Sequence, residues 1–197
     1  MAGKAREVVE GVPLHVFQQG LHEQQCFFED QDYRRYLEWM AKYSKDAGCA
    51  IHAYVLMPTH SRILLTPYER QSVSRLMMYL GRRYAHHANR AQGRSGSLFE
   101  KSFRSAMLTD PEDVLACHWY IERNPVRAML VDRPREYPWS SYHANAYAES
   151  NGILTPHAAY EELGANAAER AAAYVERSHL ELDPGHESTG LFLPRPT

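Results

Sequence analysis

Two β-rich segments separated by a short turn limit the folds available to this chain more than any other feature. Residues 50–57 (AIHAYVLM) and 61–66 (SRILLT) are rich in aliphatic and β-branched residues, Pro58 and Thr59 mark a turn between them, and Pro67 ends the second segment. A connection this short joins antiparallel neighbours, because parallel strands need a crossover of a dozen or more residues. The sequence therefore predicts a β-hairpin.

The segments on either side of the hairpin complete an alternation of strands and helices. Apolar periodicity and Gly or Pro stops predict strands at 12–20 and 98–108 and helices at about 31–47, 71–91 and 111–124. The resulting order, β-α-β-β-α-β-α, predicts an α+β fold with a ferredoxin-like split β-α-β antiparallel sheet. We expect the helices mainly on one face of the sheet, with an extra helix after the last strand.

Length and composition predict one soluble domain with an extension. We expect residues 1–147 to form the main domain and residues 148–197 an acidic helical extension, with helices at about 156–164 and 167–178 and a Pro/Gly-rich tail from Pro184. No apolar run approaches the roughly 20 residues that span a bilayer, and the N-terminus lacks the apolar core of a secretory signal. The three cysteines are scattered, which favours a cytoplasmic protein.

The charge distribution is uneven. Residues 70–108 carry eight Lys and Arg residues and a single acid, whereas residues 144–197 carry three basic against eight acidic residues. Such a run of cations is more often a solvated helix face than a phosphate-contacting surface. An exposed helix usually mixes both signs, so the near absence of acids here narrows the difference between the two interpretations. The candidate phosphate-contacting cations are Arg82, Arg83, Arg90, Arg94, Lys101 and Arg104. Tyr84 and Phe103 are candidates for base stacking, with core packing the favoured interpretation.

The second strand of the hairpin carries the triplet His60-Ser61-Arg62. Alternate side chains of a strand share a face, so His60 and Arg62 should point the same way and Ser61 the opposite way. A histidine at both outer positions would form half of a metal site, but here one position holds a cation.

The predicted last helix of the main domain contains HWYIERNP, residues 118–125. Tyr120 and Asn124 are four residues apart and should project from one helix face. A tyrosine hydroxyl can act as a covalent nucleophile, and an amide oxygen can coordinate a hard divalent cation. The structural alternatives are a half-buried aromatic residue and a helix-ending asparagine. The histidines at positions 15, 22, 52, 86, 87 and 118 are expected to be packing or surface residues.

The chain resembles the single-tyrosine transposases of the HUH superfamily, in particular the REP-associated tyrosine transposases. The resemblance is carried by nine segments that occur in the family's order with similar gaps. They are LHVFQQG (14–20), FFEDQDYRRYLE (27–38), HAYVLMPTH (52–60), LLTP (64–67), GRRYAHHANR (81–90), GSLFEKSF (96–103), HWYIERNPVRAMLV (118–131), YPWSSYHANA (137–146) and LTPHAAYEELG (154–164).

The resemblance implies a protein that binds single-stranded or hairpin DNA rather than a small molecule or a membrane. It implies that Tyr120 attacks a DNA phosphate to give a 5′-phosphotyrosine and a free 3′-hydroxyl, so that the strand can later be rejoined. It also implies a Mg²⁺ or Mn²⁺ ion between the two histidines of the strand and a polar residue one turn after the tyrosine. These positions are His60, Arg62 and Asn124. We expect a monomer rather than a dimer.

Arg62 departs from the family pattern, because a guanidinium has no lone pair and stays protonated. A metal site built from His60 and Asn124 beside this cation should be poor. Three interpretations remain open. Arg62 replaces the metal at the scissile phosphate, or the protein binds DNA without cutting it, or the gene copy is decaying.

Overall fold

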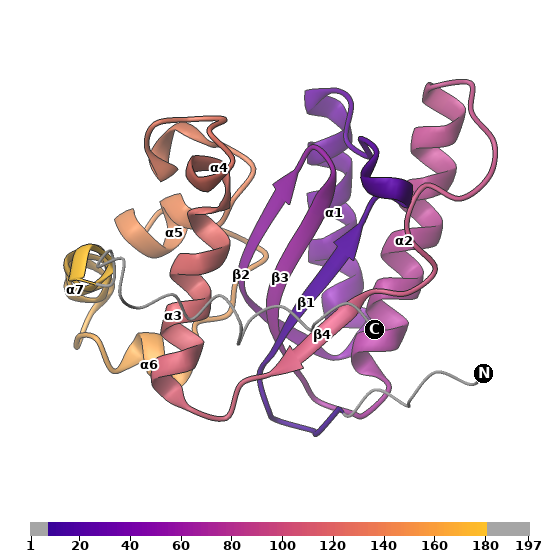
Figure 1. Cartoon of the computed structure of the whole chain (residues 1–197). Coiled ribbons are helices and arrows are strands. Elements are labelled where there is room, and N and C mark those ends of the chain that lie inside the picture. The colour runs from indigo at the N-terminus through magenta and orange to yellow at the C-terminus, as the bar shows by residue number, and fades with distance from the viewer. Residues whose placement is uncertain (1–7, 181–197) are drawn as a thin grey trace.

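Four strands form one antiparallel sheet in the order β2-β3-β1-β4 (Figure 1). The structure is a computed structural model, and it describes residues 8–180. The strands are β1 (Leu14–Gln19), β2 (Cys49–Met57), β3 (His60–Pro67) and β4 (Arg104–Met107). This order and the helices between the strands confirm the predicted ferredoxin-like α+β fold, and β2 and β3 form the predicted hairpin.

Helices α1 (Asp30–Ala47) and α2 (Ser72–Ala91) cover one face of the sheet (Figure 1). Strand alternation supplies the apolar surface beneath them, because Leu14 and Val16 of β1 and Ile63 and Leu65 of β3 point to this side and are buried. These side chains join the inner faces of both helices in one hydrophobic cluster. Both helices lie within one residue of their predicted limits.

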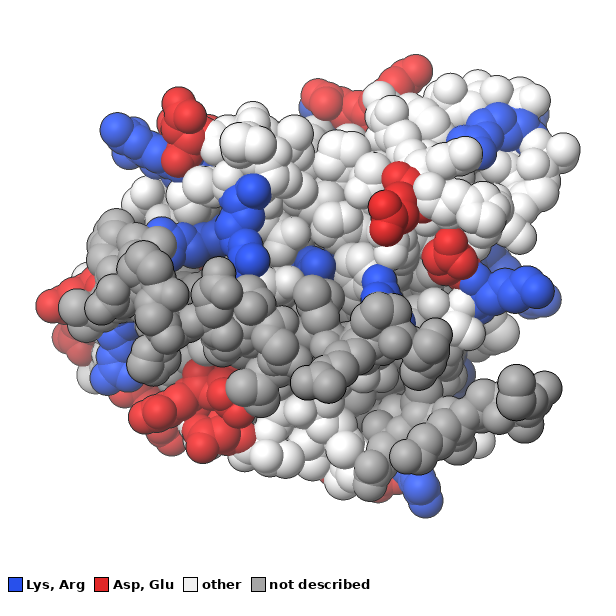
Figure 2. Space-filling model, viewed as in Figure 1, with Lys and Arg blue, Asp and Glu red and all other residues white. Residues whose placement is uncertain are grey.

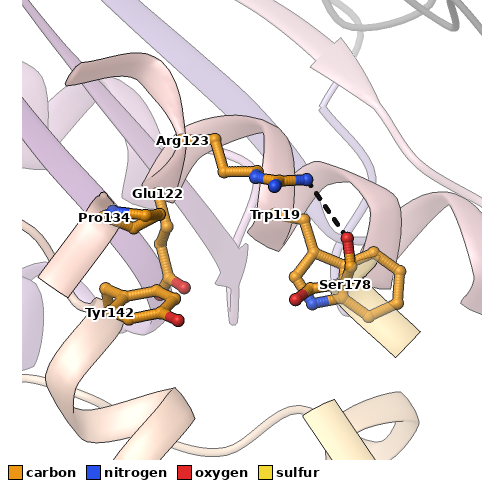
Figure 3. Close-up of a pocket in the computed structure, with 6 residues that line it drawn as sticks. All are labelled: Trp119, Glu122, Arg123, Pro134, Tyr142 and Ser178. Atoms are coloured by element: carbon orange, nitrogen blue, oxygen red, sulfur yellow. Dashed lines mark hydrogen bonds between the residues drawn. The ribbon is translucent and has the colours of Figure 1, made fainter. Parts of the chain in front are cut away.

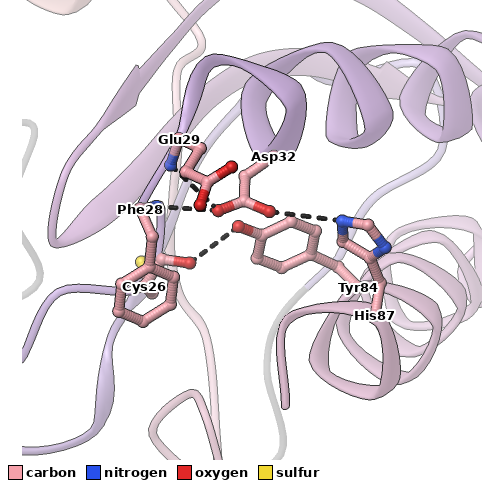
Figure 4. A network of polar contacts seen from close by, with 6 residues as sticks. All are labelled: Cys26, Phe28, Glu29, Asp32, Tyr84 and His87. Atoms are coloured by element: carbon pink, nitrogen blue, oxygen red, sulfur yellow. Dashed lines mark hydrogen bonds and ion pairs between the residues drawn. The ribbon is translucent and has the colours of Figure 1, made fainter. Parts of the chain in front are cut away.

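A polar network fixes the start of α1 against α2 (Figure 4). The Asp32 carboxylate accepts hydrogen bonds from two backbone N–H groups just before the helix, at 2.9 and 3.1 Å, and lies 3.2 Å from Nε2 of His87 on α2. The Tyr84 hydroxyl donates to the carbonyl of Cys26 at 2.7 Å. Tyr84 is fully buried and Phe103 is 8% exposed, so both pack in this core, as the favoured interpretation held.

A second layer covers the opposite face of the sheet and begins with α3 (Pro111–Glu122). The Asp110 side chain accepts a hydrogen bond from the N–H of Glu112 at 2.9 Å and caps the helix, as the acid-rich start predicts. The helix ends two residues earlier than expected. A short helix, α4 (Asn124–Arg127), follows after Arg123, so Asn124 begins a new element.

The segment from residue 132 to 142 protects the outer edge of β2. Ser140 pairs with Val55, and backbone hydrogen bonds of 2.9 and 3.0 Å join residues 139 and 141 to this strand. Further along, Leu154 pairs with Ile51 in the parallel sense. An edge with its hydrogen-bonding groups satisfied cannot recruit another strand there.

One short helix, η1 (Leu21–Glu23), lies near α1. The other helices pack in the layer of α3, and they are η2 (Pro134–Glu136), α5 (Tyr142–Tyr147), α6 (Ala158–Glu161) and α7 (Ala167–Leu180). Helices α6 and α7 were predicted, whereas α5 was not. Tyr160 and Tyr174 from this region are buried in the same hydrophobic cluster as α3. The division after residue 147 stays a prediction, and the tail from Pro184 lies outside the described residues. No described helix is both long and apolar enough to cross a membrane.

The predicted strand at 98–108 is too long. Only Arg104–Met107 pairs continuously with β1, while Phe99 makes one isolated bridge with Gly20. Leu98, Phe99 and Phe103 are buried by contact with the α1 and α2 layer, so their apolar side chains indicate tertiary burial in a loop. Residues with high strand propensity are those that pack well on a half-buried surface, and an irregular segment can bury the same residues.

Gly20 allows a close backbone approach beside the hairpin turn. Its N–H donates to the Thr59 carbonyl at 2.8 Å, and an added Cβ would lie 2.2 Å from the Gln24 carbonyl oxygen. We expect Gly20→Ala to lower the free energy of unfolding by roughly 1–3 kcal/mol, as measured by urea denaturation, because a backbone atom must move. Gly81→Ala is the matched control, since nothing lies near its Cβ position in α2, and it should stabilise by about 0.5–1 kcal/mol. Equal effects of the two substitutions would contradict this explanation.

Candidate active site

Tyr120, Asn124, His60 and Arg62 meet on the side of the sheet that carries α3. Nε2 of His60 lies 3.3 Å from Oδ1 of Asn124, and Nδ2 of Asn124 donates to the Tyr120 carbonyl at 3.2 Å. The guanidinium carbon of Arg62 is 5.1 Å from the centre of the Tyr120 ring. Tyr120 is partly exposed and packs against the hydrophobic cluster of α3.

Strand alternation places the triplet as predicted. His60 and Arg62 face α3, whereas Oγ of Ser61 lies 3.4 Å from the Tyr36 hydroxyl of α1 on the other side of the sheet. The turn before β3 holds the imidazole, because Oγ1 of Thr59 is 3.1 Å from Nδ1 of His60. The site is therefore assembled from the start of β3, the end of α3 and the start of α4.

Arginines and aromatic rings alternate across this face in what we call the guanidinium–aromatic row. Its members are Arg127, Tyr120, Arg62, Phe17 and Arg104. The Arg127 guanidinium is 5.0 Å from the Tyr120 ring centre, and those of Arg62 and Arg104 are each 4.5 Å from the Phe17 ring centre. Phe17 is the direct cross-strand partner of both Arg62 on β3 and Arg104 on β4, which explains why the three share one face.

Arg62 is a buried cation without a counter-ion. It is 7% exposed, and its Nε and Nη1 atoms have no hydrogen-bond acceptor among residues 8–180. No carboxylate in that part of the chain pairs with it. Burial lowers the pKa of Arg62, and the charges of Arg104 and Arg127 act in the same direction. Buried charged donors are normally paired, so this guanidinium has the character of an anion-binding group.

His60 is a neutral imidazole at pH 7. Burial lowers its pKa to about 4, and the positive charge of Arg62 adds to the effect. One tautomer satisfies both neighbours, with Nε2–H donating to Asn124 and Nδ1 accepting from the Thr59 hydroxyl. In this arrangement Nε2 offers no lone pair to a metal.

These residues do not fit a divalent cation. His60 and Asn124 are two neutral groups that contact each other, and residues 8–180 contain no cluster of three or more His, Cys, Asp or Glu residues arranged to hold a metal. A dication about 4 Å from a guanidinium would be repelled by roughly 8 kcal/mol at an effective dielectric of 20. The donor set favours an anion over a cation at this position.

The predicted basic surface divides between two sides of the molecule. Arg82 and Arg83 lie on the outer side of the α1 and α2 layer, where Arg83 is 5.4 Å from the Trp39 ring. Arg90, Arg94 and Lys101 are exposed near the end of α2 and the loop after it. Among the six candidates, Arg104 is the one that joins the guanidinium–aromatic row. Figure 2 shows Lys and Arg side chains across the middle of the viewed face.

Three residues beside Tyr120 were missed by sequence reasoning. Arg127 lies two helical turns after the tyrosine, and this spacing could have indicated it. Phe17 and His15 are two residues apart on β1 and therefore share one face of the sheet. The His15 ring makes an edge contact with the Tyr120 ring, with 5.9 Å between the ring centres. His15 was expected to be a packing or surface residue, and it is indeed buried. No local signal shows that β1 lies next to the strand of Arg62.

Glu122 supports the site from behind. This fully buried carboxylate accepts hydrogen bonds from Ser141 at 2.6 Å, Asn145 at 2.7 Å and Tyr174 at 2.6 Å. Burial raises its pKa to about 7, against the opposing effect of the three donors. It thereby fastens α3, two residues after Tyr120, to the segment along β2, to α5 and to α7.

A small cavity of about 40 Å³ lies beside Glu122 (Figure 3). Its lining includes Trp119 and Arg123 of the α3 end, together with Tyr142 and Ser178. The Arg123 guanidinium crosses it and donates to the Ser178 carbonyl at 3.1 Å, which gives α7 a second attachment. A cavity of this size can hold ordered water and is too small for a substrate.

The sheet order and the helix that follows the last strand define a ferredoxin-like α+β protein in which α3 and α4 bring Tyr120 and Asn124 to the strand that carries His60. A family model described as "Transposase IS200 like" matches residues 11–124, which is more than half of the chain. The protein belongs to the IS200-like transposase family. The matched range includes His60, Tyr120 and Asn124.

A solved structure of a similar protein shares the fold. A REP-associated tyrosine transposase bound to a REP hairpin superimposes with a TM-score of 0.63 at 19% identity, over 80% of this chain and 93% of that chain. A putative transposase from Deinococcus radiodurans gives a TM-score of 0.43 at 16% identity, over 61% of this chain and 95% of that chain. No curated protein gives a significant match.

Proposed function

We propose that this protein binds single-stranded or hairpin DNA and cleaves and rejoins it through a 5′-phosphotyrosine intermediate on Tyr120. The single observation that carries the proposal is the buried guanidinium of Arg62, which has no carboxylate partner among residues 8–180 and lies 5.1 Å from the centre of the Tyr120 ring. The REP hairpin bound by the structural neighbour supports a DNA hairpin as the ligand. We further propose that the protein acts as a monomer.

In the proposed step the Tyr120 oxygen forms a bond to phosphorus while the bond from phosphorus to the 3′ oxygen breaks. The phenol loses its proton to solvent and the departing 3′ oxygen gains one, so the step needs no other reactant. Phosphoryl transfer is promoted mainly by positioning and by positive charge at the phosphate oxygens. A planar guanidinium can contact two of these oxygens at once, and the buried Nε and Nη1 atoms of Arg62 have no acceptor among residues 8–180.

The proposal assigns to Arg62 the electrostatic role that the family resemblance gives to Mg²⁺ or Mn²⁺. It rests on the donor set, since His60 and Asn124 already satisfy each other and Arg62 would repel a dication. His60 and Asn124 then hold the end of α3 in register with β3, which fixes the position of Tyr120. Cleavage is therefore proposed to proceed without an added metal.

The second candidate is a DNA-binding protein that no longer cuts. The observation that favours it is the same departure at Arg62, because loss of a metal ligand can leave binding intact while removing catalysis. The rest of the site would then act as an anion-binding surface. The two candidates differ in one measurable product, a covalent bond between Tyr120 and DNA.

The test is formation of a covalent adduct on a denaturing gel. The probe is a labelled DNA hairpin with single-stranded flanks of random sequence, incubated with the protein in EDTA and, separately, in Mn²⁺. We expect an adduct in both conditions for the natural chain and complete loss of the adduct in Tyr120→Phe, because phenylalanine lacks the nucleophilic oxygen. Binding of the hairpin by Tyr120→Phe should be retained, as measured by gel shift.

Tyr68→Phe serves as the matched control, since Tyr68 is 61% exposed and precedes α2. It should form the adduct at the natural rate. A salt-sensitive gel shift without any adduct would support the binding-only candidate instead. An adduct that survives in Tyr120→Phe would reject Tyr120 as the nucleophile.

A further inference from the structure

The guanidinium–aromatic row continues beyond the nucleophile on both sides. Arg127 lies past Tyr120 on α4, and Arg104 lies past Phe17 on β4, which is an edge strand of the sheet. The row thus runs across β3, β1 and β4, transverse to the strands. Three guanidiniums that alternate with aromatic rings across one face can meet several negative charges of an extended polymer.

The three cations have no carboxylate partner among residues 8–180. The Arg127 guanidinium contacts the Tyr120 ring, and Arg104 donates one hydrogen bond, from Nη2 to Oε1 of Gln19 at 3.0 Å. Arg62 leaves two donors without an acceptor in that part of the chain. Charged donors in this state bind phosphate oxygens readily.

The two rings of the row are occupied by cations. Phe17 has guanidiniums at 4.5 Å from both Arg62 and Arg104, and Tyr120 has them at 5.1 and 5.0 Å from Arg62 and Arg127. A ring face covered in this way is not a platform for a nucleic-acid base. The row can therefore bind the DNA backbone but does not read its sequence.

Phe17 also keeps like charges in place. Arg62 and Arg104 belong to strands on either side of β1 and repel each other, and the charge of Arg104 adds to the burial that lowers the pKa of Arg62. The Phe17 ring attracts both guanidiniums, and this attraction is strongest where water is excluded. Phe17 is itself 5% exposed.

We infer that the guanidinium–aromatic row is a track for three successive phosphates of single-stranded DNA. Arg62 binds the scissile phosphate, Arg127 and Arg104 bind the phosphates on either side of it, and Phe17 is a positioning residue that sets the spacing of Arg62 and Arg104. The identity of the ligand rests on the proposed function. The path of the DNA strand across β3, β1 and β4, and binding that does not depend on the DNA sequence at these positions, go beyond the proposed function.

The test measures binding of labelled single-stranded oligonucleotides by fluorescence anisotropy over a series of salt concentrations. We expect Arg104→Gln and Arg127→Gln each to weaken binding about tenfold for every oligonucleotide sequence. Each should also reduce the slope of log affinity against log salt by about 0.7, the value for one lost phosphate contact on a single strand. Arg35→Gln is the matched control, because Arg35 is exposed on α1 on the other side of the sheet and pairs with Glu38, and its slope should stay unchanged.

The role of Phe17 is tested by a double-mutant cycle. Phe17→Leu should weaken binding about as much as Arg104→Gln. The loss of affinity in the double variant should be much smaller than the product of the two single losses, because both substitutions disturb the same contact. A purely structural role for Phe17 would give independent effects that multiply. Circular dichroism checks the folding of Phe17→Leu, and Phe17→Tyr, which keeps the ring, should bind like the natural chain.

The outcomes separate this inference from the proposed function. If the natural chain binds DNA but the slopes of Arg104→Gln and Arg127→Gln equal that of Arg35→Gln, the track is wrong and the proposed function stands. Sequence-dependent losses would also reject the track, because they would indicate base contacts. If the natural chain binds no single-stranded DNA at any salt concentration, the track is wrong, whereas the proposed function is then decided by hairpin binding and the Tyr120 adduct. Absence of the Tyr120 adduct leaves the track unaffected.

Discussion

Replacing Arg62 by glutamine will slow strand cleavage by at least about a thousandfold, since an arginine that stabilises the charge of a phosphoryl-transfer transition state contributes a factor of roughly 10³–10⁵. The measurement is the single-turnover rate of Tyr120 adduct formation at saturating protein in EDTA. The protein itself should remain folded, because Arg62 is a buried cation without a counter-ion and a neutral side chain relieves its desolvation. Arg62→Lys should retain part of the rate, since it keeps the charge but loses the planar two-donor contact.

Arg62→His provides the complementary experiment. It restores a second imidazole on the face of β3 that carries His60 and removes the repulsion of a dication. We expect this variant to be stimulated by Mn²⁺, while the natural chain is indifferent to it. If Arg62→Gln cleaves at the natural rate, or if the natural chain depends on Mn²⁺ and loses activity in EDTA, Arg62 does not act in place of a metal.

Removing the Glu122 carboxylate will lower the stability of the protein more than the other substitutions considered above. Glu122→Ala leaves three buried donors without their acceptor and opens a cavity between α3, α5 and α7, so we expect the free energy of unfolding to fall by about 2–5 kcal/mol. Urea denaturation followed by circular dichroism measures this change. Glu149→Ala is a suitable control, because Glu149 is exposed and makes only a surface contact with His143, and it should change stability by less than about 0.5 kcal/mol.

Glu122 also predicts a pH dependence of a definite sign. Its pKa of about 7 in the folded protein lies above the value of 4.5 for a free glutamate, so the folded state binds the proton more tightly. The corresponding stability is fully present below about pH 4.5 and is lost as the pH rises through about 7. Relative to Glu122→Gln, the natural chain should lose about 3 kcal/mol of unfolding free energy between pH 4 and pH 8. A stability difference that is constant over this range would show that the pKa is not raised.

Local patterns in the sequence determined most of the secondary structure. Apolar periodicity set the limits of α1 and α2 to within one residue, and the Pro-Thr turn set the β2–β3 hairpin. These patterns work because a helix or a hairpin satisfies its backbone hydrogen bonds with residues nearby in the chain. Alternation along β3 likewise placed His60 and Arg62 on one face, and the motif around Tyr120 indicated the class of protein.

Tertiary structure alone decided what surrounds the tyrosine. Phe17 lies between Arg62 and Arg104 because β1 pairs with both β3 and β4, and such pairing joins residues about 45 and 87 positions apart, for which no local pattern exists. In the same way, a glutamate near the end of a helix is usually exposed, whereas Glu122 is buried because Ser141, Asn145 and Tyr174 surround it and donate hydrogen bonds to it. The burial of Arg62 without a carboxylate partner among residues 8–180 is a property of these long-range contacts and is absent from the residue type itself.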